Sequence, residues 1–252
     1  MNFLPSAPRS PRAFTLVELL VVILVVAILG SLSFVGLRSA KRVAERAACA
    51  SSLRQLGSAV HLYAIDHNDR FPPYLEIVGG ERVWYFGIES GSGGEGDRQL
   101  DASGGPLFPY INSTSSIEIC PSFNYQSPSW KAKFDTPSWG YGYNWRLGGR
   151  FGGQPMRRTA VKNPVRCVLF GDCAQINTFQ APASPSNPML EEFYIINESF
   201  RTIHFRHNGL ANILFVDGHV EAMQPFVGTE LQILPGELLG RITASGSAEL
   251  LE

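Results

Sequence analysis

One uninterrupted apolar stretch decides the fold: FTLVELLVVILVVAILGSLSFVGL, at residues 14–37. It holds a single charged side chain, Glu18, and residues 19–37 carry no charge. As an α-helix, residues 19–37 extend about 28 Å, which is close to the ~30 Å hydrocarbon core of a bilayer. A lone segment in lipid satisfies its backbone hydrogen bonds only as a helix. The stretch therefore predicts one membrane-spanning helix.

The residues before and after this stretch differ in kind. Residues 1–13, MNFLPSAPRSPRA, contain three prolines and two arginines, a composition that disfavours a helix. Residues 38–66 contain no proline and one glycine, so we expect the helix to continue from about Phe14 to about Asp66 and to stop before Pro72 and Pro73. Apolar or small side chains recur at three- and four-residue spacing, which predicts one helical stripe. The members of this stripe are Val43, Ala47, Ala50, Leu53, Leu56, Val60, Tyr63 and Ala64. The nearest surface that could cover the stripe is the chain's own C-terminal part.

The composition excludes several classes of protein. Of the 252 residues, 44% are hydrophobic and 17% are charged, which excludes a disordered chain. A single span accounts for the apolar excess, so a polytopic membrane protein is excluded as well. The net charge of −1 argues against a basic nucleic-acid binder, and we expect no nucleic acid as a partner. Residues 1–70 carry eight basic and four acidic side chains, so the acidic excess belongs to the remainder.

Residues 71–252 are typical of a mainly β domain with long loops. Short apolar runs at 83–86, 165–170, 193–196 and 212–216 alternate with stretches rich in turn residues. The segment 139–145, WGYGYNW, alternates aromatic and small side chains, as a strand with one aromatic face does. We interpret that face as core packing rather than as a sugar-binding platform. The segment 89–105, ESGSGGEGDRQLDASGG, predicts a flexible surface loop.

The sequence around Phe14 carries a specific resemblance. Ala13-Phe14-Thr15-Leu16-Val17-Glu18-Leu19 resembles the processing site of type IV pilins and type II secretion pseudopilins, although Ala13 stands where that family usually has Gly. The resemblance implies cleavage between Ala13 and Phe14 by a prepilin peptidase/methyltransferase and N-methylation of Phe14. It also implies that Glu18 neutralises the terminal amine of a neighbouring subunit in a filament.

A second resemblance lies near the C-terminus. His207, Asp217 and Gly218 match an H-x9-D-G motif attached to one group of prepilin-like proteins. Asp-Gly between apolar runs predicts a type I′ hairpin in which Val216 pairs with His219. That register places one wholly apolar set on the core face: Ala211, Ile213, Phe215, Val220 and Ala222. We interpret the motif as structural.

The same region raises the question of a metal site. His204, His207, Asp217 and His219 offer nitrogen and oxygen ligands, but their spacing matches no zinc pattern. We therefore assign no metal ligand and no cofactor. The chain also has no nucleophile elbow or catalytic triad order, and we expect no enzymatic activity.

Four cysteines are present, and a chain exported across the inner membrane meets conditions that permit disulfides. Cys167 and Cys173 lie on one predicted strand, about 20 Å apart if the strand is extended, which is too far for a bond unless the chain turns between them. Cys49 with Cys120 is the more plausible pair.

Together these features predict an α+β, pilin-like fold, with a long N-terminal helix packed on a mainly antiparallel β domain. We expect a leader at 1–13, a transmembrane and filament-core helix at 14–37, an amphipathic continuation at 38–70, and a periplasmic domain at 71–252 with the motif at 207–218. The resemblance implies a single-pass protein of the inner membrane that assembles with other pilin-like subunits through secretion or pilus machinery. Its product would be a type II-like pseudopilus or a type IV pilus-like filament.

Two alternatives stay open. One is a membrane-anchored envelope protein that binds sugar or metal and forms no filament. The other is a secreted hydrolase behind a long signal peptide cut near Ser31-Leu32-Ser33, for which the sequence shows no catalytic constellation. The count of basic residues on the two sides of the span favours an inverted topology, whereas the resemblance implies a cytoplasmic leader.

Overall fold

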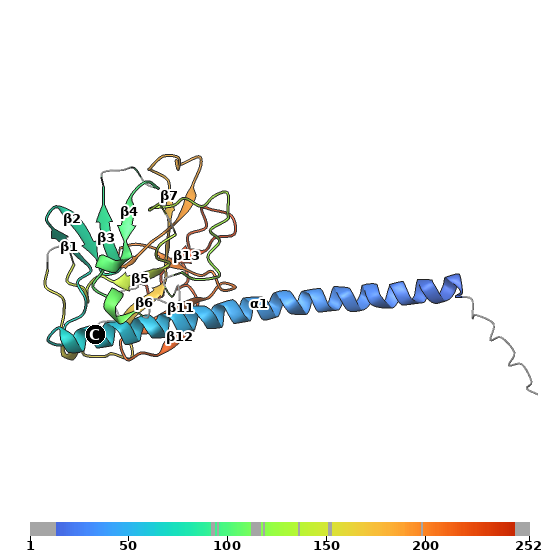
Figure 1. Cartoon of the computed structure of the whole chain (residues 1–252), viewed down its shortest axis with the longest axis horizontal. Coiled ribbons are helices and arrows are strands. Elements are labelled where there is room, and N and C mark those ends of the chain that lie inside the picture. Colours follow the sequence, from blue (N-terminus) through green and yellow to red (C-terminus); the bar gives the residue numbers. More distant parts are fainter. Residues whose placement is uncertain are drawn as a thin grey trace, which may run out of the picture. The chain divides into compact units, whose positions relative to one another are not determined.

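The computed structural model describes residues 14–244, apart from residues 92, 93, 95, 112–116, 118, 136, 151, 152 and 198. Ala13 and the rest of the expected leader lie outside the described residues. The chain divides into two compact units, Met1–Val43 and Ala44–Glu252. One helix, α1, spans Leu16–Asp66, and the elements after it are strands and short 3-10 helices (Figure 1). The predicted α+β layout, a long N-terminal helix followed by a mainly antiparallel β part, is confirmed.

The first unit presents the apolar part of α1. The helix is long and apolar enough to cross a membrane, and none of its most apolar window is buried within the protein. Its large apolar side chains are exposed where they are described, and Leu16, Ile23 and Phe34 are each more than half exposed. Val43, which we expected in the buried stripe, is exposed as well. These side chains need lipid or another protein around them.

In the second unit, α1 buries a stripe of side chains in the protein core. Leu53, Leu56 and Val60 are fully buried, and Tyr63 and Ala64 follow on the same face. Leu53 and Leu56 belong to the same core cluster as Phe170 and Leu214 of the sheet. The predicted stripe is therefore correct from Leu53 onward. It is wrong at Ala47, which is exposed.

A five-stranded sheet provides the surface that α1 covers. Its order is β12-β11-β6-β5-β9, and all neighbours are antiparallel except β5 and β9. The strands are β5 (Tyr141–Asn144), β6 (Val168–Asp172), β9 (Ile195–Ile196), β11 (Ala211–Phe215) and β12 (Val220–Met223). Within the second unit, β5, β6 and β11 lie beside α1 (Figure 1). Gly57 of α1 lies under Leu214 of β11, and a Cβ at this glycine would come 3.0 Å from a Leu214 methyl, so the absent side chain permits close packing.

The remaining strands form three smaller sheets. A four-stranded antiparallel meander has the order β1-β2-β3-β4, and β7 pairs with β8 and β10 with β13. The bounds of these strands are β1 Leu75–Val78, β2 Glu81–Trp84, β3 Gly87–Ser90, β4 Gln99–Asp101, β7 Ala174–Asn177, β8 Met189–Glu192, β10 Ile203–His204 and β13 Leu239–Gly240. Three 3-10 helices lie between strands: η1 (Ala102–Gly104), η2 (Phe108–Tyr110) and η3 (Arg158–Ala160).

The meander corrects the prediction of a flexible loop at 89–105. Glu89 of β3 is buried and accepts hydrogen bonds from the Trp84 indole and from Arg82 and Arg98. The glycines of this segment are typical of a loop, but its residues 89–90 and 99–101 belong to β3 and β4, which pair with each other.

Candidate functional site

The helix α1 begins with a reciprocal cap made by Thr15 and Glu18. Oε2 of Glu18 accepts hydrogen bonds from the backbone N–H of Thr15 at 2.9 Å and from its hydroxyl at 2.7 Å. The backbone N–H of Glu18 in turn donates to Oγ1 of Thr15 at 3.2 Å. This arrangement is a capping box, with Thr15 as the N-cap and Glu18 three positions later. The Thr-x-x-Glu spacing in the sequence is the signal for this box, which we did not predict.

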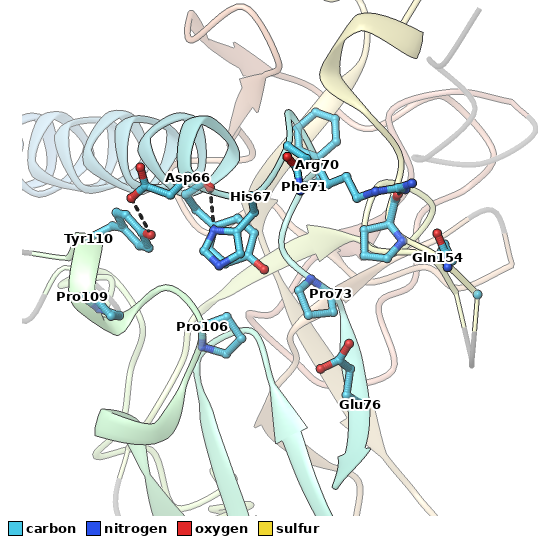
Figure 2. A pocket seen from close by; sticks show the side chains of 14 residues that line it. Asp66, His67, Arg70, Phe71, Pro73, Glu76, Pro106, Pro109, Tyr110 and Gln154 are labelled. Carbon is cyan, nitrogen blue, oxygen red and sulfur yellow. Dashed lines mark hydrogen bonds between the residues drawn. The ribbon is translucent and has the colours of Figure 1, made fainter.

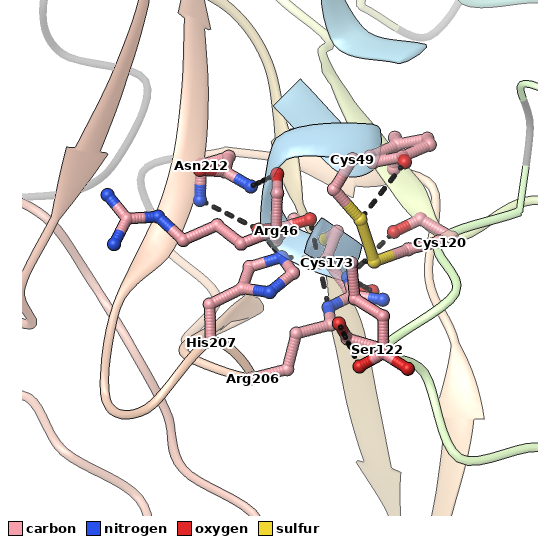
Figure 3. Close-up of a disulfide and its surroundings, with 12 residues drawn as sticks. Arg46, Cys49, Cys120, Ser122, Cys173, Arg206, His207 and Asn212 are labelled. Carbon is pink, nitrogen blue, oxygen red and sulfur yellow. Dashed lines mark hydrogen bonds and ion pairs between the residues drawn. A yellow bond between two sulfur atoms is a disulfide. The ribbon is translucent and has the colours of Figure 1, made fainter. Parts of the chain in front are cut away.

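A disulfide ties α1 to the β part of the second unit. Cys49 lies on the buried face of α1, four residues before Leu53, and its sulfur is bonded to that of Cys120. Figure 3 shows this disulfide in one cluster with His207 and Arg206. This is the pair that we favoured from the sequence. Cys167 and Cys173 are free and buried, and burial raises the pKa of each thiol to about 12.

His207, the first residue of the H-x9-D-G motif, lies between the disulfide and a buried carboxylate. Its Nε2 is 3.8 Å from Sγ of Cys120 and 3.1 Å from Oδ2 of Asp172. Asp172 ends β6 and also accepts a hydrogen bond from the backbone N–H of Asn212 in β11. The antiparallel register, in which Ile213 faces Gly171, brings these groups together.

The charge of Asp172 is balanced within the core. Nε of Arg206 lies 3.8 Å from Oδ1 of Asp172, and both side chains are buried. Burial raises the pKa of the Asp172 carboxyl, but the charge of Arg206 and the hydrogen bond from His207 outweigh this effect and hold that pKa below its usual value. Asp172 is therefore an anion at neutral pH. We predicted neither Asp172 nor Arg206 from the sequence, because the position of each depends on strand pairing.

The Asp-Gly end of the motif forms the turn between β11 and β12, with a register different from the one that we predicted. Phe215 pairs with His219, and the N–H of Gly218 donates to the carbonyl of Phe215. Gly218 has a φ of +93°. The connection is a three-residue loop with a left-handed glycine, not a two-residue type I′ turn.

This shift of one residue changes the faces of the hairpin. Leu214 now pairs with Val220, so the wholly apolar face that we predicted does not form. Both faces of β11 are buried instead, with Leu214 in the core cluster that includes α1 and Ile213 in a second cluster on the other side.

The four residues that we considered as metal ligands near this hairpin lie in three separate contacts. His204 bonds Glu237 at 2.7 Å, and His207 contacts Asp172. His219 bonds Asp217 at 2.6 Å and stacks on Phe215. The hairpin therefore does not gather them into one site.

The aromatic strand contributes to the core rather than to a binding surface. Trp139, Tyr141 and Tyr143 are at most 2% exposed. The hydroxyl of Tyr143 donates to the carbonyl of Pro72, which follows α1. These three rings are therefore not exposed for stacking against a sugar.

A pocket of about 860 Å³ opens at the C-terminal end of α1 (Figure 2). Oδ2 of Asp66 accepts a hydrogen bond from the Tyr110 hydroxyl, and Arg70 donates to the carbonyl of Pro155. The ring of His67 stacks on that of Tyr63 at 3.8 Å. The polar side chains of the helix end are thus engaged in joining α1 to the segments around it.

Beyond the pocket, an ionic contact fixes the chain that leaves α1. Oδ1 of Asp69 accepts from Nε of Arg158 at 2.7 Å, and Arg158 also contacts Nδ1 of His61 at 3.2 Å. The hydrogen bonds from Arg158 and Thr159 lower the pKa of Asp69. Burial, together with the charge of Arg158, lowers the pKa of His61.

Comparison with known proteins identifies the N-terminal segment. Residues 8–34 match the family model of the prokaryotic N-terminal methylation motif. Comparisons with curated proteins and with solved structures gave no match. The match includes Ala13, Phe14 and the capping box, and it confirms a prepilin- or pseudopilin-type N-terminus.

Proposed function

We propose that this chain, whose N-terminus is of the prepilin type, is a structural subunit that is cleaved, N-methylated and assembled into a filament. Cleavage falls between Ala13 and Phe14, and the new amine of Phe14 receives the methyl group. The observation that carries the proposal is the methylation motif at residues 8–34 on a helix whose apolar side chains are exposed. Such a helix is stable in the membrane before assembly and against other copies of the helix after it.

The capping box supports a role for Glu18 in assembly. Both hydrogen bonds from Thr15 use Oε2 of Glu18. Its second oxygen, Oε1, can therefore accept a cation without loss of the cap. The methylated α-ammonium of Phe14 on a neighbouring subunit supplies that cation. A carboxylate in an apolar environment is costly when unpaired, so this pairing favours packing of one subunit against the next.

The second unit is the part that we place in the periplasm. Its disulfide between Cys49 and Cys120 suits an oxidising compartment. We propose a type II-like secretion pseudopilus as the filament, with a surface pilus as the other member of the same class. The partners are then the prepilin peptidase/methyltransferase, other pilin-like subunits and the assembly machinery in the inner membrane.

N-terminal sequencing and mass spectrometry of the mature protein test the processing step. The expected product begins with N-methylated Phe14. A mature chain that begins at Met1, or after Ser33, contradicts the proposal.

Two matched variants test assembly. Glu18→Ala removes both the cap and the carboxylate, whereas Thr15→Ala weakens the cap and keeps the carboxylate. We expect Glu18→Ala to be processed but not assembled, and Thr15→Ala to be processed and assembled, as measured by cross-linking of subunits and by recovery of sheared filaments. Normal filaments from Glu18→Ala refute the role of the carboxylate.

A further inference from the structure

The cluster around the disulfide contains four side chains that offer metal ligands. The ligand atoms of Cys49, Cys120, Asp172 and His207 all lie within 4.8 Å of one another, and all four residues are buried. Two thiolates, one imidazole and one carboxylate are a donor set that suits Zn²⁺ in a closed, four-coordinate site.

Two edges of a zinc tetrahedron are already close to the required length. From Zn–S, Zn–N and Zn–O bond lengths of about 2.3, 2.05 and 2.1 Å, a tetrahedral site has S···N and N···O edges of about 3.6 and 3.4 Å. The structure has 3.8 Å between Sγ of Cys120 and Nε2 of His207, and 3.1 Å between this Nε2 and Oδ2 of Asp172. Once the bond between Cys49 and Cys120 is reduced, the two sulfurs need to move apart to about 3.8 Å.

The surroundings also suit a metal. The Tyr141 hydroxyl donates to Sγ of Cys49 at 3.4 Å, and the backbone N–H of Asn212 holds Oδ2 of Asp172 at 2.7 Å. Such outer contacts orient ligands around a metal. Among the described residues, none donates a hydrogen bond to the buried Oδ1 of Asp172. The carboxylate therefore has lone pairs that no hydrogen bond uses.

The charges balance with zinc bound. Zn²⁺ with two thiolates adds no net charge, and the anion Asp172 keeps its cation Arg206, whose side chain is 2% exposed. Neither the zinc form nor the disulfide form leaves an unbalanced charge in the core, where it would be costly.

We propose that the reduced form of this protein binds one zinc ion through Cys49, Cys120, His207 and Asp172. The disulfide and the zinc site are alternative states of one cluster, because a disulfide sulfur is not a thiolate ligand. In either state α1 is cross-linked to the segment that carries Cys120, and the zinc state adds β6, through Asp172, and the segment before β11, through His207. The helix thus stays anchored when the protein is in a reducing environment.

The test uses the full chain in detergent, reduced with a phosphine in urea and refolded with zinc or with cobalt(II) as a spectroscopic substitute. We expect one zinc per chain after gel filtration, and a cobalt spectrum with thiolate charge-transfer bands and the intense visible bands of tetrahedral coordination. The oxidised chain, treated in the same way, should retain no metal.

Variants identify the ligands. His207→Gln and Asp172→Asn should each weaken zinc binding at least tenfold, and Cys49→Ser should abolish the thiolate spectrum of the pair. The control His204→Gln changes another buried histidine, outside the cluster, and Cys173→Ala removes a free buried thiol. Both controls should bind zinc as the unchanged chain does, and tryptophan fluorescence verifies that each variant is folded.

Three results would overturn the proposal. The first is a folded, reduced chain that retains no zinc. The second is equal zinc binding by the unchanged chain and by Cys49→Ser. The third is loss of zinc in Cys173→Ala, which would place the ion at the free cysteines.

Discussion

Removal of the disulfide tests how strongly α1 is fastened to the rest of the second unit. Cys49 and Cys120 are separated by 71 positions, so their bond closes a large loop in the unfolded chain. The loop-closure entropy for this length amounts to about 4.4 kcal/mol at 25 °C. The double variant Cys49→Ala/Cys120→Ala should therefore lower the free energy of unfolding by about 3–5 kcal/mol.

The variant should nevertheless fold. Leu53, Leu56 and Val60 remain fully buried on the same helix face, and each such side chain contributes about 1.5–3 kcal/mol by burial. The packing of α1 thus survives without the covalent bond, which makes the change in stability measurable.

Urea unfolding of the full chain in detergent, with a chelator present to exclude metal, provides the assay. The four tryptophans all lie within residues 84–145, so their fluorescence reports on the second unit. The matched control Cys167→Ala/Cys173→Ala removes the two free thiols instead. A reductant should destabilise the unchanged chain and this control, and it should leave Cys49→Ala/Cys120→Ala unaffected.

Two results would refute this reasoning. The first is a loss of less than 1 kcal/mol in Cys49→Ala/Cys120→Ala, since the loop-closure entropy calculated for this loop is several times larger. The second is a reductant effect of equal size in that variant. A count of free thiols in urea checks the premise, because the oxidised chain should show two, from Cys167 and Cys173.

Three further predictions concern the second unit. Gly218→Ala places a side chain at a φ of +93° and should cost about 1 kcal/mol in urea unfolding, whereas the same change at an exposed glycine with negative φ should not. Glu191→Gln removes the carboxylate that pairs with Lys131 and Lys133 at 2.7 and 2.8 Å, and it should cost about 3–5 kcal/mol because two buried cations lose a buried counter-charge. Burial lowers the pKa of His204 below its usual 6.5, so its contribution to stability is complete above pH 6.5 and is lost as the pH falls through the lowered pKa. Thermal unfolding between pH 7.5 and 5 should therefore show a smaller decline for His204→Gln than for the unchanged chain.

The long helix could be predicted because its signals are local. An apolar run without breakers, followed by a three- and four-residue stripe, gave α1 to within two residues at its start and correctly at its end. The stripe itself was correct only where other elements cover it. Leu53 and Val60 are buried, whereas Ala47 is exposed, because helical periodicity identifies a face and not the length of the surface that packs on it.

The hairpin register could not be decided from the Asp-Gly pair alone. Asp-Gly suits a two-residue loop when both residues take positive φ, and it suits a three-residue loop when only the glycine does. Here Gly218 has positive φ and Asp217 does not. Asp217 uses its carboxylate to accept a hydrogen bond from the N–H of His219, which favours the longer loop.

The cluster at the disulfide depends on contacts between distant segments. Asp172 reaches His207 only because β6 pairs with β11 in a particular register, and Cys120 lies on a segment with no periodic pattern of its own. The sequence shows that these residue types are present, but strand order decides which of them meet. This is why the four residues that we considered near one hairpin, of which only His207 belongs to the cluster, did not indicate it.

The spacing of the H-x9-D-G motif matches the length of β11 and its flanking turn. Side chains on one side of β11 face α1: Asn212 donates to the carbonyl of Arg46 and Leu214 packs over Gly57. Val216, which follows β11, belongs to the same core cluster as Val60 of α1. Successive contact residues of the strand therefore meet successive positions of α1, from its earlier to its later residues.

His207 and Asp217-Gly218 stand at the two ends of that strand. His207 fixes one end beside the Cys49–Cys120 disulfide. Gly218 closes the turn at the other end, where the N–H of Asp217 donates to the carbonyl of Pro164. A residue inserted before Leu214 would move every side chain of β11 beyond the insertion to the opposite face and would separate Leu214 from Gly57. We infer that the nine-residue spacing sets the position of the strand along the helix, which gives the motif a structural role in seating α1 on the sheet.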